Sequence, residues 1–299
     1  MQQQRKTRSN GLILHNISPL VLVLTTMLPA GCAERQDRLL LAADREVAGS
    51  GLVERLLALA GDDIRPVQLL SGSSGEVLQL GHQGGADLLL VGAPAEVERL
   101  TQQGRVAEQR VLMHNEYVFV GRESDPARLA ALADGALALR QVNRSGATFA
   151  VPARGSAARF KLEQLWKLQT DRRTSPSFFA VEGGVKEAVL AAHAQGTYTL
   201  VDRATRLTYL EVKSLKPKVL LQGGAEMANP YQLVLLRPAT GREALAGRAR
   251  ALYDTMGSAE AGRLIAGYGV ARWGEPLFDA GPPPGGQPVR YDQLPPGSP

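Results

Sequence analysis

The sequence contains few of the residues from which metal sites and disulfide frameworks are built. Its 299 residues include one cysteine, Cys32, and four histidines that lie far apart in the chain. A single cysteine excludes an intrachain disulfide and a multi-cysteine zinc cluster. Scattered histidines do not favour a histidine metal site. We therefore expect neither a bound metal nor a cofactor.

Familiar catalytic signatures are also missing. The chain has no G-x-S-x-G, no H-E-x-x-H, no G-x-x-x-x-G-K-[ST], and no G-x-G-x-x-G that opens a helix. The stretch Ser71–Gly75 offers hydroxyl groups, but no histidine stands in an interpretable relation to them. A hydrolase that uses one of these serines is thus the weakest hypothesis, and we expect no enzyme.

The basic net charge comes largely from the first residues. The formal charge is +5, but Arg5, Lys6 and Arg8 precede every acidic residue. Without them, 31 basic and 29 acidic residues leave a net charge of +2. A net charge this small does not favour nucleic-acid binding, because the chain also has no cluster of Lys and Arg and only 5% aromatic residues.

Residues 1–31 have the features of an export signal. A basic start precedes an apolar run over 19–28, which is shorter than the roughly 20 residues that span a bilayer. The run ends Leu28-Pro-Ala-Gly-Cys32, which resembles a bacterial lipobox, although Pro29 departs from the usual leucine. We expect lipidation of Cys32 and attachment to a membrane of the cell envelope, facing the periplasm or the outside. Plain signal-peptidase cleavage, with Cys32 a free thiol, is the alternative.

After the leader, short apolar runs alternate with amphipathic stretches. This order predicts parallel strands with helices on both faces of a sheet. The expected strands are 38–43, 67–70, 86–91, 116–121, 147–151, 197–201 and 231–236. The expected helices are 52–60, 76–82, 94–103, 125–140, 156–168, 185–194, 204–210, 243–256 and 258–266.

Two α/β halves of similar build suggest two lobes with a cleft between them, a usual place for ligands. The strand at 231–236 implies that the chain returns to its first lobe. We expect lobe I to contain 38–117 and 232–280, and lobe II to contain 118–231. The Pro- and Gly-rich tail 281–299 is expected to be disordered.

Two strand-to-helix loops carry donors suited to an anion. In the first, Ser73, Ser74 and Gly75 precede a helix, whose start presents backbone amides and about half a positive charge. In the second, Arg154 adds a guanidinium and Ser156 a hydroxyl near the next helix start. The alternatives are that the serines only cap their own helices and that Arg154 is a surface residue or forms a salt bridge.

Several short segments match one known family in order along the chain: Gly51-Leu52, Ser73–Gly75, Gly85–Val91, Asn115–Gly121, Arg154-Gly155, Leu165–Lys167, Tyr198–Arg203, Asn229–Tyr231 and Gly274–Phe278. On these segments, the chain from about Leu39 to Phe278 resembles the tungstate-binding component of bacterial ABC importers. That family has a periplasmic-binding-protein fold with two α/β lobes, type II-like, with mixed sheets, helices on both faces and a ligand cleft between the lobes. The resemblance implies an anionic solute and the permease and ATPase of an ABC importer as partners.

The family's oxyanion site is only partly kept. Its Thr/Ser-rich loop after the first strand reads Ala42-Ala-Asp-Arg-Glu46 here, which adds negative charge from Asp44 and Glu46. Its Ser-Arg-Gly-Asp-Asp-Ser-Gly-Thr loop is shortened to Ala153–Ala158, and its Thr-Asp-Arg becomes Val201-Asp-Arg203. Each lost hydrogen bond to a charged ligand weakens binding by about 1.5–3 kcal/mol, so three losses weaken it by at least about 10³. Arg45 or Arg159 would have to compensate.

Three hypotheses follow. The first is an exported binding protein that delivers a small anion, tungstate-like or related, to an ABC permease, with Ser73, Ser74, Gly75, Arg154 and Ser156 as donors and Arg203 or Arg45 assisting. The second is a divergent domain that takes another ligand, such as one bearing both charges beside Asp44, Glu46 and Asp202, or that serves sensing or envelope assembly without transport. The third is the hydrolase.

Overall fold

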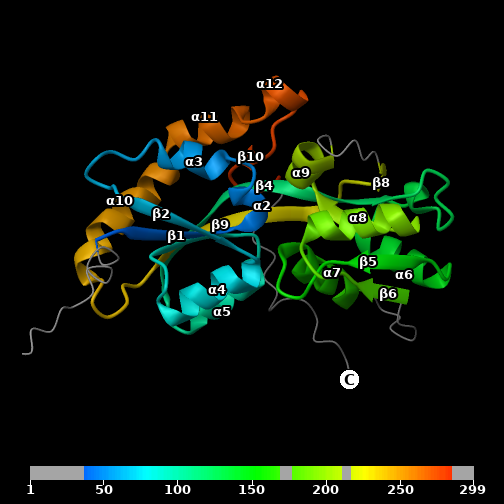
Figure 1. Ribbon diagram of the computed structural model, residues 1–299, viewed down its shortest axis with the longest axis horizontal. Coiled ribbons are helices and arrows are strands. Elements are labelled where there is room, and N and C mark those ends of the chain that lie inside the picture. The colour runs from blue at the N-terminus through cyan, green and yellow to red at the C-terminus, as the bar shows by residue number, and fades with distance from the viewer. Residues whose placement is uncertain (1–36, 169–176, 211–216, 285–299) are drawn as a thin grey trace, which may run out of the picture. The chain divides into compact units, whose positions relative to one another are not determined.

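In the computed structural model, the described residues are 37–168, 177–210 and 217–284, all of them within one compact unit (Figure 1). The leader 1–31, with Cys32 after it, lies outside the described residues. So does the tail 281–299, apart from its first four residues. The expectations about the signal, the lipid anchor and the tail therefore stay predictions.

The first half of the chain builds a sheet with three parallel strands, as the alternating pattern predicts. Strand β1 (Leu39–Asp44) lies between β2 (Val67–Gly72) and β3 (Leu88–Val91) and is parallel to both. On the far side of β3, strand β9 (Ala228–Leu236) pairs antiparallel with it, so the chain returns to its first half late in the sequence. The sheet is therefore mixed.

Helices cover both faces of this sheet (Figure 1). Helices α3 (Leu52–Leu57), α10 (Ala246–Met256) and α11 (Ala259–Gly267) pack on one face. Helices α4 (Ser74–Gln83) and α5 (Pro94–Gln102) pack on the other face. The helices predicted at 52–60, 76–82, 94–103, 243–256 and 258–266 are thus confirmed, with ends that differ by a few residues.

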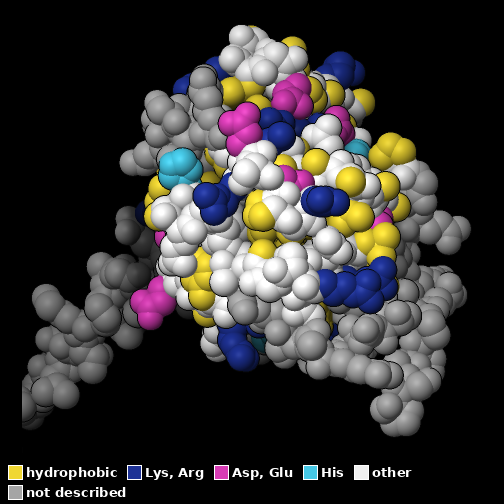
Figure 2. All heavy atoms as spheres, turned by 90° about the vertical axis from the view of Figure 1, so that its right-hand side faces the viewer, with side chains coloured by type: hydrophobic (Ala, Val, Ile, Leu, Met, Phe, Trp, Pro, Cys, Tyr) yellow, Lys and Arg dark blue, Asp and Glu magenta, His cyan; other side chains and the backbone are white. Residues whose placement is uncertain are grey.

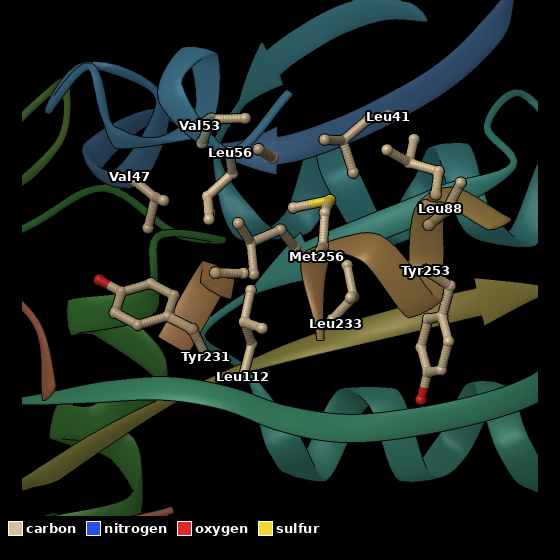
Figure 3. Close-up of a cluster of buried hydrophobic side chains, with 14 of the residues drawn as sticks. Leu41, Val47, Val53, Leu56, Leu88, Leu112, Tyr231, Leu233, Tyr253 and Met256 are labelled. Atoms are coloured by element: carbon tan, nitrogen blue, oxygen red, sulfur yellow. The ribbon is translucent and has the colours of Figure 1, made fainter. Parts of the chain in front are cut away.

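Side chains of the buried strands alternate between the two faces, because successive residues of a strand point in opposite directions. Leu41 and Leu88 contact the layer that holds α3 and α10, whereas Leu89 contacts the layer of α4 and α5. Figure 3 shows the first of these clusters, in which Leu56, Met256 and their neighbours meet. Tyr231 lies at its edge, with its hydroxyl pointing away from the leucines.

Two long strands run from the first half into the second (Figure 1). Strand β4 (Val106–Gly121) pairs antiparallel with β9 over most of its length, and its last residues pair with β7 (Thr199–Asp202) and β8 (Lys218–Leu221). The strand predicted at 116–121 begins ten residues earlier, at Val106. Polar, partly exposed residues interrupt this earlier portion, which conceals it in the sequence.

The second half packs helices around β4, β7 and a short parallel sheet of β5 (Thr148–Val151) and β6 (Ser177–Ala180). Its core is more aromatic than that of the first half, with edge-to-face contacts of Phe149 with both Phe119 and Phe178. On its outer face, basic, acidic and hydrophobic side chains are interspersed (Figure 2). Its helices are α6 (Gly135–Arg144), α7 (Ala157–Lys167) and α8 (Val185–Gln195).

The helix predicted over 125–140 is wrong in its first part. Asp125 has a φ of +40°, which is not a helical conformation. Its carboxylate accepts hydrogen bonds from the amides of Leu129 and Ala130, and the segment that follows forms a single 3-10 turn, η1 (Leu129–Ala131), in place of an α-helix. Helix α6 then starts afresh, capped by Asp134, whose carboxylate accepts from the amide of Leu137.

The helix predicted over 204–210 is a short α9 (Arg203–Thr205) followed by the π-helical turn η2 (Arg206–Leu210). The remaining short elements are α2 (Arg45–Ala48), α12 (Val270–Trp273), η3 (Ala225–Met227), η4 (Glu243–Leu245) and β10 (Asp279–Ala280). Of the described helices, none combines the length and the apolar composition needed to cross a bilayer.

Candidate functional site

The two loops predicted to carry the ligand meet each other. One follows β2 and opens α4; the other follows β5 and opens α7. The amide of Gly75 donates a 2.8 Å hydrogen bond to the carbonyl of Gly155. A methyl group on Gly75 would lie 3.2 Å from the Gly155 Cα, so a larger residue would force the two loops to shift by a few tenths of an ångström. Residues 80 positions apart thus bring the start of one helix from each half to a common place.

In this arrangement the hydroxyls of Ser73 and Ser156 cap their own helices. Ser73 Oγ accepts from the amide of Glu76 at 3.3 Å, and Glu76 Oε2 accepts from the Ser73 amide at 2.7 Å, which is a capping box. Ser156 Oγ accepts from the amide of Arg159 at 3.2 Å and donates to the carbonyl of Ala153 at 3.0 Å. To donate to a ligand, each hydroxyl has to exchange one of these contacts.

The three arginines predicted to bind the ligand differ in their exposure and in their ion pairs. Arg154 is exposed, and within the described parts of the chain it has no hydrogen bond or ion pair. Arg45 is 58% exposed and lies 3.4 Å from Glu76. Arg203 is 9% exposed and pairs with Asp279 and, at 3.5 Å, with Glu116. Arg154 is therefore the guanidinium that can reach a solute without giving up a partner.

Asp44, at the carboxyl end of β1, lies fully buried beside these loops. Its Oδ2 accepts a 2.7 Å hydrogen bond from the amide of Gly92, whereas its Oδ1 has no partner among the described residues. Burial, and next the nearby Glu46, raise the pKa of Asp44 well above its usual value. The Gly92 amide and the neighbouring Ser74 hydroxyl act in the opposite direction.

Two further carboxyl groups stand close to Asp44. Glu46 is partly buried, and a methyl group on Gly184 would lie 3.3 Å from its Oε1, so it reaches the start of α8 in the second half. Burial and then Asp202 raise the pKa of Glu46. Asp202 is itself buried, and its Oδ1 accepts from Asn115 at 3.2 Å and from the amide of Thr205 at 3.0 Å.

A buried polar network joins these acids to the crossing strands. Asn229 Nδ2 donates to Asn115 Oδ1 at 2.8 Å and to the hydroxyl of Tyr231 at 2.9 Å. Burial raises the pKa values of Tyr117 and Tyr231 well above the usual range, and the charge of Asp202 adds to both effects. Both phenols therefore stay neutral.

Sequence reasoning named no role for Asn115, Tyr117, Asn229 or Tyr231. All four stand in strands β4 and β9, inside segments that were matched to the family. Their place in segments matched to the family was the available signal, because the polar residues on either side of Asn115 conceal its burial.

A cavity of about 210 Å³ adjoins this network, between α5 of the first half and α7 of the second. Gly92 and Asn229 form part of its wall, and the Gly92 amide is the one bound to Asp44. Phe160 and the buried Lys161 line the α7 side. Lys161 Nζ donates to the carbonyls of Glu226 and Ala228, and burial lowers its pKa to about 8. The cavity is connected to the acidic cluster through Gly92, but neither the three acids nor the predicted donors of the two loops line it.

The site brings together hydroxyls, amides, one unengaged guanidinium and three carboxyl groups, so it suits a small charged solute. Within the described ranges, no group of three or more His, Cys, Asp and Glu side chains is placed to hold a metal ion.

Comparisons with known proteins agree with this architecture. Residues 64–271, more than half of the chain, match the family model described as bacterial extracellular solute-binding protein. The chain is 26% identical over 282 residues to a tungstate-binding protein of Peptoclostridium acidaminophilum, a match that covers 89% of this chain and 96% of the relative. It is 27% identical over 236 residues to a putative ABC transporter anion-binding protein of Haloferax volcanii, covering 78% and 69%.

Among solved structures, the tungstate ABC transporter protein of Geobacter sulfurreducens superposes with a TM-score of 0.67 at 25% identity, covering 78% of this chain and 99% of that one. The predicted two-lobed fold and the resemblance to tungstate-binding proteins are thereby confirmed. The chain belongs to the family of bacterial extracellular solute-binding proteins.

Proposed function

We propose that this protein captures a small anion between its two lobes and delivers it to the permease and ATPase of an ABC importer. The observation that carries the proposal is the meeting of the Ser73–Gly75 and Arg154–Ser156 loops, one from each half. Each loop opens a helix whose first amides favour negative charge. Arg154 is free to add a guanidinium. Binding without catalysis fits the relatives, which are named as binding proteins.

The solute has to displace contacts that the two loops make with each other. The Gly75 amide is engaged by Gly155, and the hydroxyls of Ser73 and Ser156 serve as helix caps. We infer that the lobes separate at this contact to admit the solute. Ser74 Oγ and Arg154 remain as donors with no competing partner in the described chain. Arg45 assists by leaving its exposed contact with Glu76, and Arg203 by leaving Asp279.

The protein acts outside the cytoplasm in this proposal, in the periplasm or on the outer face of the membrane. The family name and the signal-like leader support export. Acylation of Cys32 would hold the protein near its permease by acyl chains. Labelling cells with a radioactive fatty acid tests the anchor: the native protein incorporates label, and the Cys32→Ser variant does not.

A thermal-shift screen with tungstate, molybdate, sulfate and phosphate tests anion capture, because a ligand that binds only the folded state raises Tm. We expect at least one of these anions to raise the Tm of the native protein and of the control variant Arg55→Ala, which alters an exposed arginine on α3. Arg154→Ala should lose the shift while its ligand-free Tm stays within a few degrees. No shift with any anion would contradict the proposal.

A second candidate is a solute that carries both charges. The three carboxyl groups of Asp44, Glu46 and Asp202 favour it, because they lower the affinity for a simple anion. Adding amino acids to the same screen separates the two candidates.

A further inference from the structure

We propose that Asp44 and Ser74 form a subsite for a primary ammonium group carried by the solute. This inference rests on the proposed function, because it takes the solute to bind between the two lobes. Asp44 Oδ1 and Ser74 Oγ are both fully buried. The Ser74 hydroxyl lies close enough to act on the Asp44 carboxyl, but neither atom has a hydrogen bond of good geometry within the described part of the chain. Buried polar atoms left so poorly satisfied are rare in folded proteins, so this pair indicates that a further donor is missing.

The carboxyl group of Asp44 is held in one orientation. Its Oδ2 accepts from the Gly92 amide at 2.7 Å, and a methyl group on Gly92 would lie 3.1 Å from both Asn229 Oδ1 and the Tyr231 ring. These neighbours leave little room for the carboxyl to turn. The Oδ1 atom is therefore a fixed acceptor, and Ser74, the first residue of α4, lies near enough to act on the same carboxyl.

Within the described residues no side chain forms an ion pair with Asp44 itself. Arg45 and Lys186 act on the adjacent Glu46, where they oppose the rise in pKa that burial causes. Arg45 is turned to Glu76, and Arg203 is paired with Asp279. Glu46 and Asp202 add further negative charge from α2 and β7. A buried carboxylate without a cation is costly, and a cation from the solute would remove that cost.

The surroundings of Asp44 Oδ1 and Ser74 Oγ favour an ammonium group over other cations. A primary ammonium is compact and has three N–H donors, which suits the carboxylate Oδ1, the Ser74 hydroxyl and one further acceptor. A planar guanidinium needs a wider fork of acceptors. Among the residues that the structure describes, no group of three or more His, Cys, Asp and Glu side chains is placed to hold a metal ion.

Two matched pairs of solutes test the subsite at pH 7 by calorimetric titration. Taurine and isethionate share a sulfonate, and glycine and glycolate share a carboxylate; in each pair a hydroxyl replaces the ammonium. We expect taurine or glycine to bind at least about tenfold more tightly than its hydroxyl partner, as one hydrogen bond to a charged group implies.

Two variants locate the effect. Ser74→Ala removes a buried hydroxyl that makes no hydrogen bond of good geometry to the described residues, so the fold should persist, and it should reduce the preference for the amine. Asp44→Asn should abolish the preference, because the amide can still accept from Gly92 but carries no charge. Ser145→Ala, which alters an exposed serine at the end of α6, is the matched control and should keep it.

The outcomes separate this inference from the proposed function. If tungstate, isethionate or glycolate binds but the amines show no advantage, the ammonium subsite is refuted and anion capture stands. An amine preference that survives in both Ser74→Ala and Asp44→Asn also refutes the subsite. Amine-dependent binding without any response to simple anions supports the subsite and refutes capture of a simple anion. No binding of any of these solutes refutes both.

Discussion

Two buried aspartates lie at opposite ends of the parallel strands in the first half, and their surroundings differ. Asp87 precedes β3, at the amino ends of the strands, and is 7% exposed. Its Oδ1 accepts from Arg242 Nε at 2.9 Å, and its Oδ2 accepts from the Leu40 amide at 2.7 Å and from the same guanidinium. Asp44, at the carboxyl end of β1, is fully buried but has one hydrogen bond, from Gly92, within the described chain.

We interpret this difference as one between a structural carboxylate, Asp87, and a carboxyl group that a solute could engage, Asp44. Asp87 joins β1, β3 and the segment before α10, and every one of its acceptor atoms is satisfied, which is how a buried charge contributes to a fold. Within the described residues, Asp44 Oδ1 makes no hydrogen bond of good geometry, and the carboxyl groups of Glu46 and Asp202 lie nearby. In open α/β sheets, ligands bind outside the carboxyl ends of the strands, which is where Asp44 lies.

The largest effect should follow the loss of the satisfied carboxylate. Asp87→Asn leaves the Arg242 guanidinium without its counter-charge in a mostly buried position. We expect the free energy of unfolding to fall by about 3–5 kcal/mol, as measured by urea denaturation. A loss below about 1 kcal/mol would mean that Asp87 is no more important to the fold than Asp44, and the contrast would disappear.

Lys161 extends the comparison to a buried cation of the second half. Its ammonium group donates to the carbonyls of Glu226 and Ala228 at 2.8 and 2.7 Å, so Lys161→Met leaves both acceptors unsatisfied. We expect a loss of about 2 kcal/mol in the free energy of unfolding.

The stability difference between native protein and Lys161→Met should also depend on pH. Burial lowers the pKa of Lys161 to about 8, below its unfolded value near 10.4, so the charged form opposes folding. The native protein should therefore gain stability relative to the variant as pH rises from about 8 towards 10. Urea denaturation at pH 7.5 and pH 10 measures this gain; equal differences at both values would contradict the assignment.

Asp44→Asn should act in the opposite direction from Asp87→Asn. Because burial raises the folded-state pKa of Asp44, its ionisation opposes folding, and the resulting loss of stability grows as pH rises above the unfolded value near 3.9. The asparagine variant should be more stable at pH 7 by about 1 kcal/mol or more, and the two proteins should converge near pH 4. The charged and polar ionisable groups around Asp44 and the adjacent Glu46 are Asp202, Tyr117, Tyr231, Arg45 and Lys186. Destabilisation at pH 7 would show that Asp44 is a second structural aspartate.

The smallest effect concerns the contact between the two loops. A methyl group on Gly75 would lie 3.2 Å from Gly155 Cα, so Gly75→Ala should push the loops apart with a loss of less than about 1 kcal/mol, because few other contacts are disturbed. Small-angle X-ray scattering should show a larger radius of gyration for the variant. An unchanged radius would mean that this contact does not hold the lobes together.

Local patterns made much of the secondary structure and the two donor loops predictable. The leucine runs of β1 and β3 and the serine and glycine residues before α4 are signals within a few residues of sequence. The S-x-x-E of Ser73 and Glu76 was also present and would have identified the capping box. The break at Asp125 was hidden, because Asp-Pro is compatible with both a helix start and a turn.

The polar interior could not be predicted, because its partners are distant in sequence. Asp87 and Arg242 are 155 residues apart, and Asn115 and Asn229 are 114 apart. Lys161 occurs within a helix whose apolar neighbours were recognised, yet its own burial depends on carbonyls 65 and 67 residues later. Asp44 and Glu46 were recognised as a departure from the family's loop, but their burial and missing partners are tertiary facts.

The central claim is that the solute binds beside Asp44. Calorimetric titration of a bound solute in two buffers of different ionisation enthalpy measures the protons exchanged on binding. Binding of a simple anion should be coupled to proton uptake by the carboxyl groups, and binding of an amine to proton release. In either case Asp44→Asn should reduce the exchange, and Glu46, whose pKa is also raised, should account for what remains. Binding without proton exchange, or exchange that Asp44→Asn leaves unchanged, would contradict the account.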